Sequence, residues 1–201
     1  MSSYEVKVIK PGYTTWLSDT EVKADGTITL ITGPKNIIVD TGLPQDRDTI
    51  LTALQKENLK PEDISFVICT HGHSDHIGNI NLFPNATVIV SHDVCKGDVY
   101  TIHNFASGKP YIIDEDIEVV PTPGHTGQDV SVIVRTRDGI VAVVGDLFEC
   151  EADLKDELIW RKFSSSPEIQ ETNRLKILET ADYIVPGHGS MFPTGASQAT
   201  R

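Results

Sequence analysis

Four side chains of types that commonly bind metal ions fall within six consecutive residues, directly after an apolar run at 66–69. They are His71, His73, Asp75 and His76. The apolar run predicts the end of a strand, and a helix is expected to begin after it. Four such side chains converge only if the loop that carries them curls around a common centre. Imidazole and carboxylate groups together indicate that this centre is a metal ion.

Three further candidate ligands lie singly along the chain, each at the end of an expected strand and each directly after a glycine. They are His125, Asp146 and His188. A small preceding residue lets the backbone approach closely, as a crowded metal centre requires. A lone histidine is usually an ordinary surface or core residue, but five of the seven histidines belong to this pattern. The pattern therefore predicts one shared site.

The number of candidate ligands indicates more than one ion. Seven ligands exceed the four of a closed structural zinc site, so two ions that share a bridging carboxylate account better for the set. A divalent ion can lower the pKa of a bound water to about 7, so a bridging hydroxide is the expected nucleophile. The carboxylates of the set, Asp75 and Asp146, are the predicted catalytic residues.

Short β-rich segments recur along the chain, together with one expected amphipathic helix and one further expected helix. Several strands are apolar nearly throughout, which predicts a layered α/β domain with both faces of its sheets covered. One sheet between helices and two sheets packed face to face between helices both satisfy this pattern. The expected strands are 4–9, 27–31, 36–39, 64–70, 86–90, 117–120, 130–135, 140–144 and 183–186, and the expected helices are 46–59 and 167–180.

Length and composition are typical of one globular domain over residues 1–201, with 39% hydrophobic and 23% charged residues. No apolar run approaches the roughly 20 residues that cross a bilayer, and the start lacks the apolar stretch of a signal peptide. We therefore expect no membrane association and a cytoplasmic location, with a nuclear location as the alternative.

Cys69, Cys95 and Cys150 lack CxxC spacing, which indicates buried free thiols.

A net charge of -12 argues against broad, non-specific binding of nucleic acid. It does not exclude a nuclease, because two divalent ions would add about four positive charges at one place in a cleft. The sequence leaves open whether the chain forms a homodimer.

The seven candidate ligands, in this order and spacing, resemble the metal-binding signature of the metallo-β-lactamase superfamily over nearly the whole chain. The segment Val39-Asp40-Thr41-Gly42 resembles the early Asp-Thr-Gly turn of that family. In the family this aspartate, Asp40 here, supports the ligand loop from behind. The resemblance implies an αββα sandwich with the metals at one edge between the two sheets.

The same resemblance assigns the ligands. It implies two divalent ions, usually Zn²⁺, while Fe²⁺ or Mn²⁺ stay open because no cysteine ligand fixes the choice. By motif position, His71, His73 and His125 would bind the first ion, Asp75, His76 and His188 the second, and Asp146 would bridge them.

Further segments at 70–79, 82–84 and 91–93 resemble a member of the family that is associated with endoribonucleolytic 3′-end processing of replication-dependent histone pre-mRNA. This resemblance implies a zinc-dependent phosphodiesterase, with single-stranded RNA as the expected partner. The short spacing between Asp146 and His188 leaves no room for the large insert of the mRNA-processing and DNA-repair nucleases of the family.

Candidates for substrate contact and proton transfer lie outside the ligand set. Arg161 and Lys162 stand between Trp160 and Phe163, a pattern that could stack a base and contact a phosphate. The alternative is an amphipathic segment that buries its aromatic rings and keeps its charges in water. His92 and His103 could each donate a proton to a leaving group, or be ordinary surface or supporting histidines.

Four functions follow from this site. The first is an endoribonuclease in which the bridging hydroxide attacks phosphorus. The second is a thioester or lactone hydrolase of the glyoxalase II-like type, which the acidic charge and the lack of a basic stripe favour. A non-catalytic metal-binding scaffold is the third, although the intact ligand set speaks against it. Redox chemistry at an iron centre is the fourth.

Overall fold

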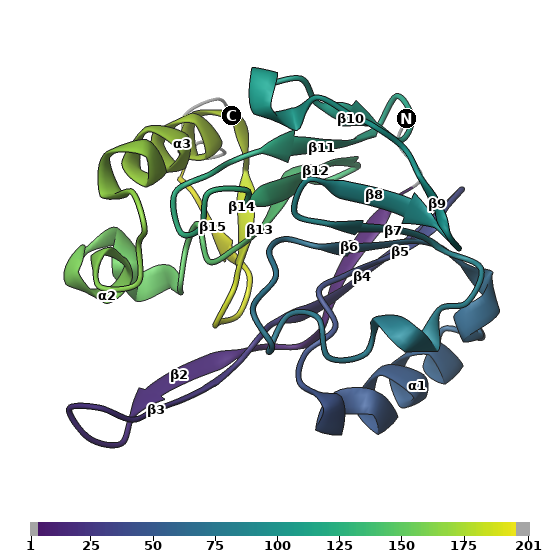
Figure 1. The fold of residues 1–201 in the computed structure, drawn as a ribbon, viewed down its shortest axis with the longest axis horizontal. Helices are drawn as coiled ribbons and strands as arrows, with labels where there is room; N and C mark the ends of the chain where they lie inside the picture. The colour runs from purple at the N-terminus through teal and green to yellow at the C-terminus, as the bar shows by residue number, and fades with distance from the viewer. Residues whose placement is uncertain (1–3, 196–201) are drawn as a thin grey trace.

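The computed structural model describes residues 4–195, which form four layers in the order helix, sheet, sheet, helix (Figure 1). The first sheet has the strand order β1-β4-β5-β6-β7-β8-β9, and the second has the order β10-β11-β12-β13-β14-β15. Helix α1 (Arg47–Lys56) packs on the outer face of the first sheet, and helix α3 (Pro167–Thr180) on that of the second. The chain is therefore an αββα sandwich, which decides between the two layouts that the strand pattern allows.

Every expected strand and both expected helices have counterparts in the structure, although α1 ends three residues earlier than expected. The unexpected elements are short or exposed: β2, β3, β8, β9, β10, β15 and helix α2 (Leu158–Arg161). The strand bounds are β1 Glu5–Lys10, β2 Tyr13–Trp16, β3 Val22–Asp25, β4 Ile28–Thr32, β5 Asn36–Val39, β6 Ile64–Cys69, β7 Thr87–Val90, β8 Asp93–Lys96, β9 Val99–Tyr100, β10 Tyr111–Ile112, β11 Ile117–Pro121, β12 Val130–Thr136, β13 Gly139–Gly145, β14 Tyr183–Pro186 and β15 Phe192–Pro193.

The central strands are apolar on both faces because each face meets a different layer. In β5, Ile37 and Val39 pack between the two sheets, whereas Ile38 packs with the residues of α1. In β12, Val132 packs between the sheets and Ile133 packs under α3. Side chains alternate across a strand, so a strand that is apolar at every position needs cover on both sides.

Residues 71–79 form turns, and the helix that the sequence predicts there is absent from this part of the chain. The neighbouring turn at 40–43 forms hydrogen bonds with this loop. Thr41 N–H donates to the His76 carbonyl at 2.7 Å, and the Asn79 amide donates to the carbonyls of Thr41 and Leu43 at 2.8 and 2.7 Å. These hydrogen bonds satisfy polar groups of the loop and its neighbouring turn, so no helical hydrogen bonds are needed there.

Strands β2 and β3 form a separate two-stranded hairpin that projects from the sandwich on the side of α2 (Figure 1). Tyr13, Trp16 and Val22 are exposed on it. The sequence does not predict this hairpin, because its strands lack the regular apolar alternation of a half-buried strand.

The structure can be compared with two expectations from the sequence, one about the cysteines and one about membrane-spanning segments. Cys69 is a buried free thiol as predicted, but Cys95 and Cys150 are half-buried. None of the helices described between residues 4 and 195 is long and apolar enough to cross a bilayer.

Candidate metal centre

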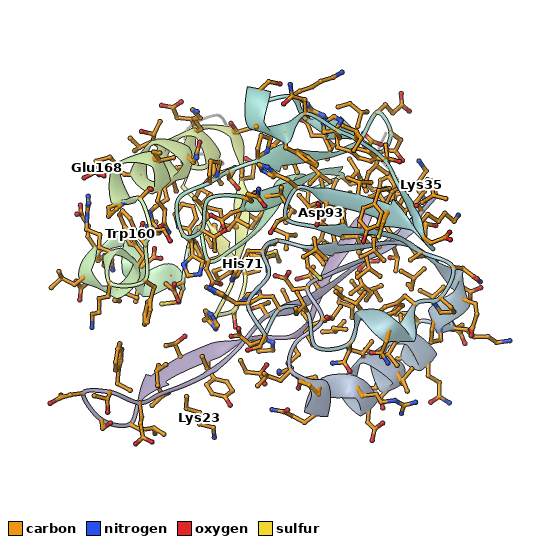
Figure 2. The ribbon with its side chains drawn as sticks, viewed as in Figure 1. Lys23, Lys35, His71, Asp93, Trp160 and Glu168 are labelled. Atoms are coloured by element: carbon orange, nitrogen blue, oxygen red, sulfur yellow. The ribbon has the colours of Figure 1, made fainter. Side chains whose placement is uncertain are left out.

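The structure brings all seven predicted ligands to one edge of the sandwich, where strands of both sheets end. The loop at 71–76 follows β6 of the first sheet. Asp146 and His188 follow the adjacent parallel strands β13 and β14 of the second sheet. His125 lies on the loop between β11 and β12. Figure 2 shows His71 at this edge, on the side of the molecule that carries Trp160.

The first group of ligand atoms consists of His71 Nε2, His73 Nδ1, His125 Nε2 and Asp146 Oδ2. His73 Nδ1 lies 2.9 Å from His71 Nε2 and 3.1 Å from His125 Nε2. Asp146 Oδ2 lies 3.5 and 3.2 Å from the same two nitrogens. Tetrahedral ligands with bonds of about 2.0–2.1 Å stand about 3.3–3.4 Å apart. These four atoms therefore have the spacing of a tetrahedral metal site.

The second group consists of Asp75, His76 and His188, again with Asp146 beside them. His76 Nε2 lies 3.2 Å from Asp146 Oδ1, and His188 Nε2 lies 3.4 Å from Asp146 Oδ2. Asp75 Oδ2 lies 3.9 Å from His76 Nε2 and 3.8 Å from His188 Nε2. The Asp146 carboxylate thus touches ligand atoms of both groups, which is the place of a bridging ligand.

Unsatisfied polar atoms provide an independent test of this fit. His76 Nε2 and Asp146 Oδ1 are buried and have no hydrogen-bond partner among the described residues. Buried polar atoms are nearly always partnered, so each such atom requires an explanation. A cation between these ligands would satisfy both atoms, so the residues present fit a metal.

Burial and the Asp146 carboxylate shift the pKa values of the histidines in this cluster in opposite directions. Burial, together with the neighbouring His76, holds the pKa of the His71 imidazole well below its ordinary value. Burial alone would also lower the pKa of His188, but Asp146 outweighs it and raises that pKa to about 9. The anionic Asp146 therefore attracts positive charge here, which a bound ion would supply in place of protons.

Asp40 orients a ligand from behind the site. Its Oδ2 lies 2.9 Å from His76 Nδ1, which turns His76 Nε2 toward Asp146. Its Oδ1 accepts the Thr70 N–H at 2.8 Å and so fixes the start of the ligand loop. Asp40 itself has a φ of 57°, a left-handed conformation that aspartate and asparagine tolerate better than most residues.

We expect Asp40→Ala to weaken metal affinity by about 10- to 100-fold, because the acceptor that orients His76 is lost. Competition with a chromophoric chelator measures this affinity. Asp40→Asn is the matched control, since it keeps the backbone conformation and one acceptor oxygen, and its loss should be smaller. If Asp40→Ala binds metal as tightly as the wild type, Asp40 is an ordinary turn residue.

Glycines next to the ligands permit the close backbone approach that the sequence predicts. Gly145 has a φ of 54°, and a Cβ there would overlap the side chain of Thr70. A Cβ at Gly187 would overlap Asp146 Oδ1. At these two positions the crowding of the centre requires glycine.

A cavity of about 200 Å³ opens onto the ligands. A second cavity of about 240 Å³ shares four of its lining residues and extends under the β2–β3 hairpin. The first is lined by Thr14, Val22, Ala24, His73, Asp75, His125, Asp146, Glu149, Phe163 and His188; the second adds Trp16, Cys150, Ile159 and Lys162. The ligand cluster is thus reached through a largely apolar and aromatic entrance.

The aromatic side chains at this entrance come from two distant segments. Trp16 of β2 stacks on Phe163, which follows α2, with ring centroids 5.7 Å apart and planes at 16°. Lys162 Nζ lies 5.1 Å from the centre of the Trp16 ring. The hairpin therefore meets the segment after α2 beside the metal cavity.

The two predicted substrate-binding residues take different positions. Lys162 is exposed and lines the second cavity. Arg161 lines neither cavity; its guanidinium pairs with Glu157 at 2.8 Å and with Glu171 at 2.6 Å. The alternative prediction, an amphipathic segment that buries its aromatic rings, holds for Trp160, which is buried. Phe163 is only half-buried and lines the cavity.

His92 and His103 lie in a different cluster. Both rings pack on Phe105, with centroid distances of 5.2 and 4.5 Å. His92 lines a separate cavity of about 640 Å³ to which none of the seven ligands contributes. Within residues 4–195, neither histidine belongs to a group of possible metal ligands.

Sequence reasoning missed Glu149 and Trp16. Glu149 lines both cavities and is buried beside Asp146 and His188. Burial, followed by the nearby Asp146, raises the pKa of its carboxyl well above the ordinary value. Its only sequence signal is its position three residues after Asp146, which does not distinguish it from the acidic residues that follow it.

Comparison with known proteins agrees with this geometry. The family model described as "Metallo-beta-lactamase superfamily" matches residues 24–188. A Xenopus laevis protein named metallo-beta-lactamase domain-containing protein 1 is 46% identical over 194 residues, which cover 95% of this chain and 82% of that protein.

Solved structures show the same fold at low sequence identity. An N-acyl homoserine lactone hydrolase, with the product N-hexanoyl-L-homoserine bound at its catalytic metal centre, has a TM-score of 0.67 and 19% identity, with 92% of each chain covered. AidC, a dizinc quorum-quenching lactonase in complex with a product, has a TM-score of 0.59 and 17% identity, with 83% of this chain and 74% of that chain covered. Identities this low establish the fold alone.

Proposed function

The chain belongs to the metallo-beta-lactamase superfamily, and from this premise we propose that it is a hydrolase that uses two divalent metal ions to cleave RNA phosphodiester bonds. The observation that carries the substrate class is the entrance to the metal cavity. There Trp16 and Phe163 offer aromatic rings, and Lys162 offers a positive charge. Stacking rings beside a cation are typical of sites for single-stranded nucleic acid.

The two ligand groups support two ions. His71, His73 and His125 would hold the first, Asp75, His76 and His188 would hold the second, and Asp146 would bridge them. We propose Zn²⁺ as the ion, with Fe²⁺ or Mn²⁺ as alternatives, because imidazole and carboxylate ligands suit all three.

When bound, such ions supply a water of lowered pKa as the nucleophile and a positive charge that stabilises the transition state. The residues of the chain prepare this chemistry. Asp146 fixes the separation of the two groups, and Asp40 fixes the direction of His76. Asp75 is half-buried and lines the cavity, so we assign its carboxylate as the acceptor of the proton that the attacking water releases.

In this proposal the β2–β3 hairpin and the segment after α2 position the substrate. Trp16 is 47% exposed, so its ring has free surface on which a base can stack. Lys162 would contact the adjoining phosphate. A single strand is the expected substrate because a duplex would bring a second charged strand against a chain of net charge -12.

We expect Trp16→Ala to weaken binding of single-stranded RNA by about 5- to 150-fold, because stacking contributes about 1–3 kcal/mol per base. Lys162→Glu should weaken binding further at low salt and lower the salt dependence by about one phosphate contact. Fluorescence anisotropy with labelled RNA at several salt concentrations measures both effects, and metal content should stay unchanged.

Arg161→Gln is the matched control for Lys162. Its guanidinium is engaged by two glutamates outside the cavities, so RNA binding should change little. If Trp16→Ala and Lys162→Glu bind RNA as well as the wild type, the entrance is not an RNA contact surface.

A second candidate function is hydrolysis of a small thioester or lactone. The apolar lining favours it, because Val22, Ala24 and Ile159 offer carbon surface to an acyl chain and no group for a phosphate. Fully metallated protein that turns over such esters while leaving single-stranded RNA intact would shift the assignment to this function.

A further inference from the structure

Glu149 is a buried carboxylate that has too few partners in the protein. It lies on the loop after β13, three residues beyond Asp146, and is only 3% exposed. Its Oε1 has no hydrogen-bond partner among residues 4–195. Burying a carboxylate without a counter-charge is costly, so such a group is normally paired or coordinates a metal.

The guanidinium that binds this loop from α3 is already engaged by other groups. Arg174 donates to both carboxylate oxygens of Asp153, at 2.6 and 3.0 Å, and to the Leu147 carbonyl at 2.8 Å. Asp153 also accepts the backbone N–H of Glu149, which fixes the loop but leaves the Glu149 carboxylate free. Arg174 therefore does not neutralise the Glu149 carboxylate, whose one ion-pair partner in the described residues 4–195 is the candidate ligand His188.

The carboxylate points toward the metal-facing atom of a ligand. His188 Nδ1 donates to the Asp25 carbonyl at 3.1 Å, so Nε2 is the nitrogen available to an ion. Glu149 Oε2 lies 3.9 Å from that nitrogen. Asp75 Oδ2 and Asp146 Oδ2 lie 3.8 and 3.4 Å from the same nitrogen. Glu149 thus stands at the distance at which the other ligands stand.

The possible ligand groups agree with this placement. One atom each from Asp146, Glu149 and His188 lie within 4.8 Å of one another, as do atoms from Asp75, His76 and His188. The two groups share His188. An ion bound to His188 Nε2 would therefore have carboxylates of both groups within reach.

We propose that Glu149 is an additional ligand of the second metal ion, beside the seven residues of the family signature. This inference rests on the proposed two-metal function. With Asp75, Asp146 and Glu149, three of the five residues around this ion are carboxylates, whereas three of the four around the first ion are histidines. Oxygen ligands suit Mn²⁺, so the second site should prefer Mn²⁺ more strongly than the first does.

Metal binding tests the assignment without reference to any substrate. Apo protein is titrated with Mn²⁺ and followed by electron paramagnetic resonance, and Co²⁺-loaded protein is followed by visible absorption, which reports coordination number. Glu149→Gln and Glu149→Ala should lower affinity at one site by at least about tenfold. The Co²⁺ spectrum of that site should change while that of the first site does not.

Glu151→Gln is the matched control, because Glu151 is a nearby exposed carboxylate on the same loop. The thermal midpoints of the apo variants separate a ligand role from a structural one: a ligand role predicts little change in apo Glu149→Gln. Two ions bound with wild-type affinities and spectra in both Glu149 variants would overturn this inference alone. A wild type that binds only one ion would overturn both the inference and the two-metal function.

Discussion

Asp146→Ala is expected to bind neither ion tightly and to lose activity by about 10³-fold or more, because several kilocalories per mole of transition-state stabilisation depend on the ions. The two oxygens of Asp146 approach candidate ligand atoms of both groups, at 3.2 Å from His125 Nε2 and 3.2 Å from His76 Nε2. On the proposed assignment, its removal would take a ligand from each ion, together with the negative charge that lies among the five histidines of the cluster.

Metal content by mass spectrometry and initial rates on the best substrate measure this effect. Glu151→Ala controls for removal of a nearby exposed carboxylate and should keep both ions. Circular dichroism checks that Asp146→Ala is folded. A folded Asp146→Ala protein that keeps two ions and near-normal rates would show that another residue bridges the metals.

Asp153→Ala is expected to lower the free energy of unfolding by about 3–5 kcal/mol, because it leaves a buried charge without its partner. Asp153 is 1% exposed and accepts two bonds from the Arg174 guanidinium. That guanidinium also lies over the rings of Phe148 and Trp160, at 3.9 and 4.8 Å from their centres. It connects α3 and α2 to the loop that carries Asp146.

Urea denaturation of the apo protein gives this free energy. Glu157→Ala is the control, since Glu157 pairs with Arg161 on the surface, where an ion pair contributes little. A change for Asp153→Ala as small as that of the control would mean that Arg174 reaches water or another acceptor when its partner is lost.

The candidate ligands can be recognised in the sequence because metal binding restricts residue types more than packing does. His71, His73 and His76 lie close together in one loop, and Asp146 and His188 follow strands whose apolar pattern is unambiguous. The central strands are equally readable, since an apolar residue at each position of β12 or β13 requires cover on both faces. That pattern leaves the number of sheets open. In the structure Val132 packs in the core between the two sheets, whereas Ile133 packs in the core under α3, so there are two sheets.

The sequence pattern does not predict the entrance to the site. Strand β2 carries Trp16 in an exposed hairpin, and its stack on Phe163 joins segments more than a hundred residues apart. Local pattern contains no information on such a contact. Arg161 and Lys162 are neighbours in the sequence, yet only the structure separates the lysine at the cavity from the arginine held by Glu157 and Glu171.

Metal content and turnover, measured together on one preparation, test the central claim most directly. The account predicts about two divalent ions per chain and cleavage of single-stranded RNA that stops when a chelator removes the ions and returns when they are restored. Full activity with one ion per chain, or fully metallated protein that leaves single-stranded RNA intact, would contradict it.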